Sequence, residues 1–221
     1  MNTPEKDFKA ILNEIRFYES GPTVDGMERL GLNYHKNFGV SLIKLKKISE
    51  KYRPNHHLAG LLRTKNFRET KILALMIDDI RKLNINEINI IIEDISTQEL
   101  AEQTVINILE KDKKFYDKAN ELINFDNEYK ISCGFVFYSR IATIDNEVKD
   151  AFFENFFQKG IKFSDNKSIH IRKSIARAFR QTALRNDELK TKVLQCMSVL
   201  KGNNNKNSDL VYEEVVPLIS F

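Results

Sequence analysis

The sequence has 221 residues, of which 42% are hydrophobic and 30% charged, and its formal net charge is +4. This composition is typical of a soluble globular protein, because its apolar runs stay well short of the roughly 18 residues that a membrane span needs. The N-terminal residues also lack the apolar core of a signal peptide, so the sequence predicts a cytoplasmic protein that has no membrane partner.

The two cysteines, Cys133 and Cys196, stand far apart in the sequence. Neither belongs to a CxxC motif or has a histidine at the spacing of a metal site. We therefore expect two buried thiols in a reducing compartment, with no metal and no cofactor. A disulfide between the two residues is the alternative.

Helical spacing dominates the chain, and sustained alternation of apolar and polar residues is almost absent. The first predicted helix runs from Thr3 to about Tyr18, with Thr3 as its N-cap and Pro4 at its first position. Further helices are predicted at about 24–32, 41–52, 55–64, 67–79, 86–95, 98–111, 113–124, 128–143, 147–159, 167–185 and 187–200. The fold class is therefore all-α.

The helices are joined by a few residues each and pair with a period near 35 to 45 residues, which favours a HEAT-like solenoid of stacked antiparallel helix pairs. A compact irregular bundle is the alternative. We expect a single HEAT-like domain over residues 1–201 and a polar linker with a C-terminal tail over 202–221. Residues 202–209 are predicted to be loose, and residues 210–221 are apolar enough to dock on the body as a cap.

Positive charge is concentrated near the N-terminus, between residues 36 and 71. This segment carries ten Lys or Arg residues and only two acids, an excess of eight in a chain whose net charge is +4. Charge this concentrated on helices indicates a polyanion as the partner, with nucleic acid as the leading candidate. A solvated lysine face on a helical protein is the alternative.

The predicted helix at 41–52 gives this charge a direction. Lys44, Lys47 and Lys51 recur at i, i+3 and i+7, with Ser41 as the expected N-cap. Another face carries an apolar stripe of Leu42, Leu45, Ile48 and Tyr52. Four aromatic or imidazole side chains close to the basic segment are candidates for stacking on bases, although Tyr52 fits the core better: Tyr34, His35, Phe38 and Tyr52.

A second basic block lies at residues 167–201, which contain nine basic and two acidic residues. An acidic block at 76–110 separates the two basic blocks in the sequence. In the second block Lys173, Arg177 and Arg180 recur at i, i+4 and i+7, opposite an apolar stripe of Ile171, Ile175 and Phe179. In a curved solenoid both basic blocks could grip a duplex backbone with carboxylates between them. We therefore expect Lys44, Lys47, Lys51, Lys173, Arg177 and Arg180 to face a common groove.

Three motifs carry a resemblance to a known family: Gly39-Val40-Ser41 followed by Leu45-Lys46-Lys47-Ile48-Ser49, then Leu58-Ala59-Gly60-Leu61-Leu62, then Glu69-Thr70-Lys71-Ile72-Leu73-Ala74. Together they resemble the AlkD-type alkylpurine DNA glycosylases of the DNA alkylation repair family, which are HEAT-like proteins. The likeness is specific over about 40 residues and continues over the rest of the chain mainly in helix count, spacing and charge. It implies duplex DNA as the partner.

The resemblance also implies a chemistry. The family removes cationic N3- or N7-alkylated purines, and its enzymes need only stabilise positive charge on the sugar and position a water. The family's carboxylate ends a W-D-x-x-D element, which matches Gln98-Glu99-Leu100-Ala101-Glu102 here. This match makes Glu102 the candidate catalytic residue, with Glu99 one turn earlier as an assistant. Acids that favour the dipole at the start of a helix are the alternative reading.

The sequence departs from the family at its aromatic cage, since the chain contains no Trp. Gln98 stands where the first aromatic wall would be, and Arg177 falls near the second. The family's central arginine matches the neighbourhood of Ser132 and Cys133, where there is no base. Whether the chain is an enzyme therefore stays open, and the alternatives are a catalytically silent DNA-binding protein and a protein-interaction scaffold.

Overall fold

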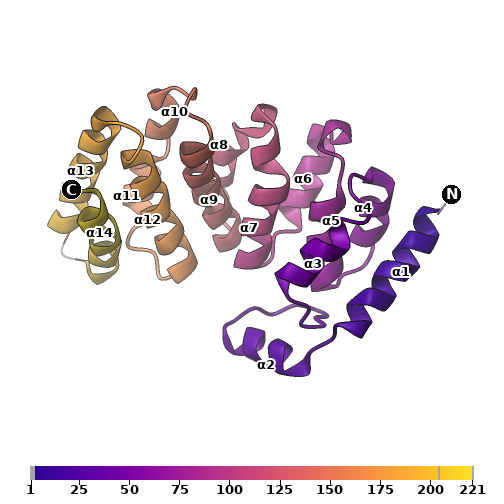
Figure 1. Ribbon diagram of the computed structural model, residues 1–221. Helices are drawn as coiled ribbons and strands as arrows, with labels where there is room; N and C mark the ends of the chain where they lie inside the picture. Colours follow the sequence, from indigo (N-terminus) through magenta and orange to yellow (C-terminus); the bar gives the residue numbers. More distant parts are fainter. Residues whose placement is uncertain (1–2, 204, 221) are drawn as a thin grey trace. The chain divides into compact units, whose positions relative to one another are not determined.

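A computed structural model describes residues 3–203 and 205–220, and over those residues the chain forms helices and no strand. The chain divides into two compact units, residues 1–108 and residues 109–221 (Figure 1). The expected all-α fold class is therefore confirmed. A single domain over residues 1–201 stays a prediction.

Unit 1, residues 1–108, contains seven α-helices and one short 3-10 helix in its described part: α1 (Pro4–Phe17), α2 (Gly21–Arg29), α3 (Leu42–Ser49), α4 (His56–Arg63), α5 (Arg68–Ile77), η1 (Ile80–Lys82), α6 (Ile85–Glu93) and α7 (Gln98–Asn107). Thr3 caps α1 through a bond from the Lys6 amide, and Ser41 caps α3 in the same way, as the sequence predicts. Asn55 and Thr97 cap α4 and α7.

The helices of unit 1 pack with α5 at the centre. Helix α5 contacts α3 on one side, α7 on the other and α4 behind, while α1 packs against α4. Figure 1 shows α3, α5 and α7 as neighbours, with α2 standing apart from them. No described residue of α2 is buried. This packing leaves α3 and α7 free to present side chains to a partner.

Unit 2, residues 109–221, begins with two short 3-10 helices and continues with α-helices: η2 (Leu109–Lys111), η3 (Lys113–Phe115), α8 (Lys118–Leu122), α9 (Glu128–Ile144), α10 (Asp150–Glu154), α11 (Phe157–Phe163), α12 (Ile169–Ala183), α13 (Asp187–Gly202) and α14 (Lys206–Ile219). Helix α12 is its centre, in contact with α9, α11, α13 and α14. Short connections make the consecutive long helices antiparallel neighbours, which is the arrangement expected from the sequence.

The structure corrects three of the expected helix boundaries. The helix expected at 98–111 ends at Asn107 and continues as η2, the one at 113–124 is split into η3 and α8, and the one at 147–159 is split into α10 and α11. Short helices therefore replace a single long one at each of these points.

The C-terminal segment is more ordered than the sequence suggests. Gly202 is the last residue of α13 and Lys206 the first of α14, so the stretch 202–209, predicted to be loose, is helical at both ends; residue 204 lies outside the described residues. Asn205 caps α14 by accepting bonds from the Asn207 and Ser208 amides. Helix α14 packs on α12 and α13, in line with the expectation that the apolar tail docks on the body.

Both cysteines are buried free thiols, as expected, and no disulfide joins them. Burial raises the pKa of Cys133, and it raises the pKa of Cys196 to about 11. Raised values keep both thiols protonated at neutral pH, so neither is poised as a nucleophile.

Candidate nucleic-acid interface

Helix α7 carries the two candidate carboxylates, and the structure gives them different surroundings. Glu99, in the first turn, accepts bonds from Nε and Nη2 of Arg68 at 2.7 and 2.6 Å. Its Oε2 also accepts a bond from the Tyr34 hydroxyl at 2.7 Å. Both oxygens of Glu99 are therefore occupied, and its side chain is only 13% exposed.

Arg68 is the residue that sequence reasoning missed. Its side chain is 1% exposed, and besides Glu99 it reaches Glu69 at 3.0 Å and the Val40 carbonyl at 2.8 Å. Burial alone would lower the pKa of Arg68, but the carboxylates of Glu99 and Glu69 raise it. Glu69 in turn accepts the amide of Phe38. This cluster ties the start of α7 to α5 and to the loop before α3.

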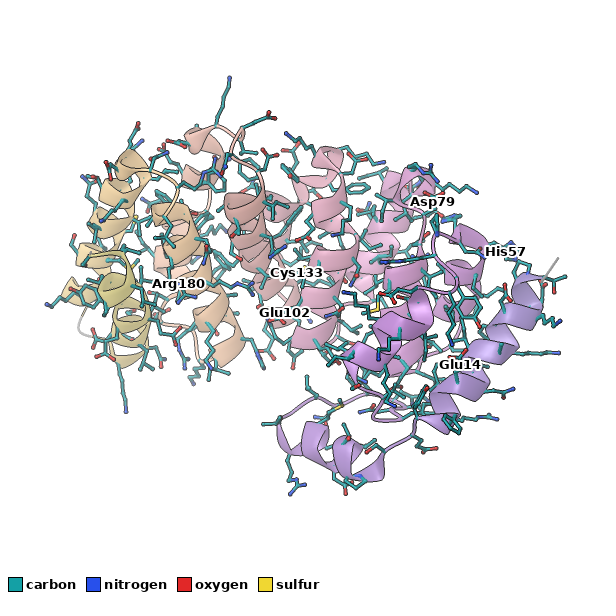
Figure 2. The ribbon with its side chains drawn as sticks, in the orientation of Figure 1. Glu14, His57, Asp79, Glu102, Cys133 and Arg180 are labelled. Carbon is teal, nitrogen blue, oxygen red and sulfur yellow. The ribbon has the colours of Figure 1, made fainter. Side chains whose placement is uncertain are left out.

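Glu102 lies on the solvent-facing side of α7 (Figure 2). Its side chain is partly exposed, and Oε1 accepts a bond from Nε2 of Gln98 at 3.1 Å, one helical turn earlier. With a period of 3.6 residues, Gln98, Glu102 and Ile106 share one stripe of the helix, whereas Leu100 and Thr104 lie on the other side. Of the two acids, Glu102 is the one that can meet a ligand in solvent.

A hollow of about 370 Å³ opens on the other side of α7, between that helix, α5 and α6. Leu100 and Thr104 line it together with the ion pair between Lys71 and Asp94, whose charged atoms are 2.7 Å apart. Glu102 points away from this hollow because it stands two residues from Leu100, about half a turn around the helix. The hollow is therefore separate from the candidate carboxylate.

The N-terminal basic segment is less available than its charge suggests. Four of its ten bases form ion pairs with acids of unit 1: Lys51 with Glu14, Arg63 with Asp78, Arg68 with Glu69 and Glu99, and Lys71 with Asp94. Three of these acids come from the acidic block at 76–110. Part of that block thus neutralises the basic segment within the same unit.

Helix α3 nevertheless keeps exposed lysines. Lys44 and Lys47 are exposed, whereas Lys51 lies beyond the end of the helix and is bound to Glu14 at 2.7 Å. The hydrogen bond to Glu14 is the main cause that raises the pKa of Lys51. The expected apolar stripe is buried at Leu45 and Ile48. The prediction is wrong at Leu42, which is exposed, and only partly right at Tyr52, which is half-buried.

Helix α12 presents its cations without acidic partners. Lys173 is exposed, and Arg177 and Arg180 are half-buried; none of their side chains forms an ion pair or hydrogen bond with another described residue. Figure 2 labels Arg180 on this helix. The opposing stripe of Ile171, Ile175 and Phe179 is buried, as predicted. The row on α12 is therefore a rigid line of unneutralised positive charge.

Most side chains expected to stack on bases are committed elsewhere. Phe38 is buried, the hydroxyl of Tyr34 binds Glu99 and Thr97, and the hydroxyl of Tyr52 reaches Glu14 at 3.5 Å. Burial, followed by the charge of Glu99, raises the pKa of Tyr34. His35 stays exposed. Tyr34, Phe38 and Tyr52 are thus structural residues in this fold.

The positions that match the family's central arginine are occupied by buried residues of the core. Ser132 and Cys133 stand on α9, and both are fully buried in unit 2. Their burial leaves no room for a charged side chain that reaches a ligand from these two positions. The match to the family thus continues in the backbone but not in the charge.

The family model described as DNA alkylation repair enzyme matches residues 11–210 of the chain. The chain belongs to the DNA alkylation repair enzyme family. No helix in the described part of this family member combines the length and apolar character that a membrane crossing requires. Nor do its described residues place three or more His, Cys, Asp or Glu side chains so that they could hold a metal ion.

A solved structure supports the fold of this family member. It comes from a protein described as one of "a new family of proteins related to the HEAT-like repeat DNA glycosylases with affinity for branched DNA structures". The two chains superpose with a TM-score of 0.77 at 18% sequence identity, over 94% of this chain and 93% of the other. The HEAT-like fold is therefore established. No curated protein sequence matches the chain significantly.

Proposed function

We propose that this protein binds duplex DNA along its sugar–phosphate backbone, with little sequence preference. The observation that carries the proposal is the row of Lys173, Arg177 and Arg180 on α12, which has no acidic partner among the described residues. Lys44 and Lys47 on α3 form a second exposed set. Unneutralised cations held on rigid helices are what phosphate contacts require. The proposal assigns phosphate contacts to each set within its own unit.

Lys51 has a smaller part in this proposal than Lys44 and Lys47. Its ammonium is already bound to Glu14 at 2.7 Å, so a phosphate would have to compete with that carboxylate. With about five phosphate contacts, the logarithm of the binding constant should fall with the logarithm of salt concentration at a slope near −4 to −5. Such a slope separates backbone binding from binding through apolar contacts.

The test is charge reversal with matched controls. Arg177→Glu or Lys173→Glu on α12, and Lys47→Glu on α3, should each weaken duplex binding and make the salt slope shallower by about 1 to 2. Lys162→Glu on α11 and Lys82→Glu in η1 reverse exposed lysines outside these helices and should change affinity far less. Fluorescence anisotropy at low and moderate salt measures both quantities. Absence of binding at low salt would refute the proposal.

Branched DNA belongs in the same panel of substrates. The structural relative is described as having affinity for branched DNA. A four-way junction presents backbones in several directions, so two separate sets of cations can engage it more fully than a straight duplex. We propose that the junction binds more tightly than its arms as separate duplexes, and competition between the two measures this directly.

A second candidate function, excision of cationic N3- or N7-alkylated purines, is favoured by the partly exposed position of Glu102. A carboxylate next to the sugar would stabilise the positive charge that develops as the glycosidic bond breaks. The alkylated base already leaves readily because its ring is charged, so no aromatic cage is needed to activate it. Glu99 was expected to assist, but both its oxygens are bound by Arg68 and Tyr34, so this candidate rests on Glu102.

Base release from DNA containing 7-methylguanine tests this candidate. Glu102→Gln keeps the shape of the side chain and removes its charge, so release should fall at least tenfold relative to the wild type. Glu213→Gln, an exposed carboxylate on α14, is the matched control and should keep full activity. Neutral lesions should not be released. Intact DNA binding without release would favour a silent DNA-binding protein, and absence of both would favour a protein-interaction scaffold.

A further inference from the structure

An aromatic pair lies where α1 ends, formed by the exposed Phe17 and the half-buried Tyr18. Phe17, the last residue of α1, is 81% exposed, more than any other large hydrophobic side chain in the described part of the chain. Its ring contacts the edge of Tyr18, with the two centroids 5.1 Å apart. A single exposed apolar residue needs no explanation, but this one is paired with a second ring and with a cation.

The cation comes from α3. Nζ of Lys44 lies 3.8 Å from the centroid of the Tyr18 ring. Its helix also exposes Lys46 and Lys47, neither of which forms an ion pair with a described residue. The aromatic pair thus borders the same exposed lysines that the proposed function assigns to the DNA backbone.

The last turn of α1 is tied to the segment that follows α3. Glu14, one turn before Tyr18, binds Nζ of Lys51 at 2.7 Å and the hydroxyl of Tyr52 at 3.5 Å (Figure 2 labels Glu14). These contacts also neutralise the acid closest to the rings on α1. Glu19, an exposed acid, follows the pair in the sequence. The aromatic rings are therefore presented from a fixed helix end and not from a loose segment.

We propose that Phe17 and Tyr18 form a stacking site for an unpaired nucleobase, with Lys44 and Lys47 on the adjoining phosphates. Every base has a π-face, so stacking on an exposed ring is tolerant of sequence, and nearby cations follow the backbone. In a paired duplex the bases are stacked on one another and cannot reach the ring. The inference rests on the proposed DNA binding and names the DNA that this end of unit 1 recognises, which is DNA with a base out of the stack.

A protein partner fits the surface around Phe17 less well than nucleic acid does. Protein interfaces are depleted in lysine at their cores, whereas this patch combines two rings with Lys44 and with Lys47 one turn later. Charge complementarity favours an anionic polymer that also carries aromatic groups. Nucleic acid with an unpaired base meets both conditions.

The experiment compares two DNA molecules that differ by one unpaired nucleotide. A labelled duplex and the same duplex with a single-nucleotide bulge are titrated with wild type, Phe17→Ala, Phe17→Leu and Phe17→Trp. Phe17→Ala and Phe17→Leu should weaken binding to the bulged duplex by about tenfold, since a stacked base contributes roughly 1–3 kcal/mol. Both should leave the perfect duplex unaffected. Phe17→Trp should retain selectivity for the bulge.

The introduced indole gives a second readout. The natural chain has no Trp, so emission at the indole wavelength in Phe17→Trp reports on this one position. It should be quenched by the bulged duplex and much less by the perfect one. Ile90→Ala on α6, which removes a side chain that is 65% exposed at a position away from α3, is the control and should keep the wild-type preference.

The outcomes separate this inference from the proposed function. If wild type binds both DNA molecules but Phe17→Ala binds the bulged one as tightly, the stacking site is refuted while backbone binding stands. Wild-type affinity in Phe17→Leu would also refute it, because an apolar contact without a π-face would then suffice. If wild type binds neither molecule at low salt, both proposals fall together.

Discussion

The two units are built from similar stacked helices but are stabilised at their centres in different ways. Unit 1 has a buried ion cluster in which Arg68 joins Glu69, Glu99 and the Val40 carbonyl. Unit 2 has a cluster of aromatic rings around Phe156, whose ring lies within 6.0 Å of four others, centroid to centroid: Phe135, Tyr138, Phe157 and Phe179.

The difference follows from the path of the chain. In unit 1 a long connection, residues 30–41, leaves the helices and returns to start α3, and its buried end includes the amides of Phe38 and Val40, which have no helical partner. Buried amides need acceptors, and Glu69 supplies them to Phe38 and Val40 at 3.1 and 3.2 Å. A buried carboxylate then needs a cation, which is Arg68. The helices of unit 2 are joined more directly, so apolar packing suffices.

The largest expected effect breaks the ion cluster. Arg68→Ala leaves Glu69 buried without its cation and removes the partner of Glu99, so we expect unfolding free energy to fall by about 5 kcal/mol. Arg81→Ala removes an exposed arginine from its pair with Asp79 and should cost far less, because solvent screens that pair. Urea unfolding followed by circular dichroism measures both. Similar losses for the two arginines would show that burial does not set the importance of the ion pair.

Removing the central ring of unit 2 should cost slightly less. Phe156→Ala creates a cavity among the four neighbouring rings, and we expect a loss of about 4 kcal/mol. Hydrogen exchange at neutral pH should place the loss of protection in α9, α11 and α12. Phe17→Ala is the same substitution at an exposed ring and should change stability by less than about 0.5 kcal/mol. If protection fell first in unit 1, the assignment of Phe156 to a unit 2 core would be wrong.

One glycine from each unit gives a comparison with a smaller expected change in stability. A Cβ at Gly134 on α9 would lie 2.7 Å from Cγ2 of Ile123 and 2.9 Å from the carbonyl oxygen of Ala119, so Gly134→Ala should cost about 2 kcal/mol. A Cβ at Gly60 on α4 meets nothing within 4 Å, so Gly60→Ala should stabilise unit 1 by up to about 1 kcal/mol. Thermal melts of the two variants should therefore shift in opposite directions, and shifts of the same sign would contradict the tight approach of α8 to α9.

The sequence predicted well whatever depends on local pattern. Thr3 and Ser41 cap their helices because the capping bond joins residues three apart. The stripe of Ile171, Ile175 and Phe179 is buried because apolar spacing of 3 to 4 residues defines one side of a helix. The same pattern places Lys173 on the opposite, exposed side. Helices, caps and the cation row of α12 could thus be read without a structure.

The sequence could not show which charges neutralise one another. Arg68 is one of the ten bases of the 36–71 segment, but its partner Glu99 stands 31 residues later and is itself the expected assistant in catalysis. Lys71 and Asp94 are 23 residues apart and likewise form a pair. Partners at such separations are set by helix packing, for which a single sequence carries no signal. Counting charge along the chain therefore overestimated the free charge of unit 1.

The exposed ring of Phe17 was missed for a related reason. Aromatic residues were sought next to the basic segment in sequence, at Tyr34, Phe38 and Tyr52, and these serve the core or its hydrogen bonds. Phe17 lies about 30 residues before Lys47, and the end of α1 meets α3 through the contact of Tyr18 with Lys44. Its only local signal is its place at the very end of a predicted helix, where the apolar stripe has already stopped.

The smallest expected effect concerns alkaline pH, where only unit 2 carries thiols. Cys133 and Cys196 are both buried, and burial raises the pKa of Cys196 from its ordinary value of 9.0 to about 11. A folded-state pKa above the unfolded value means that the folded chain holds the proton longer. The stabilisation is therefore complete below about pH 9 and is lost as pH rises toward 11. Between pH 8 and 10 each thiol should lower the unfolding free energy by about 1 kcal/mol.

Urea unfolding under reducing conditions should show this fall of unfolding free energy with pH in the wild type and a flatter slope in Cys133→Ala/Cys196→Ala. The slope is the readout because the alanines alter stability at every pH, whereas only the thiols titrate in this window. An unchanged slope in the double variant would assign the alkaline loss to tyrosines, including Tyr34 of unit 1, whose pKa is also raised by burial.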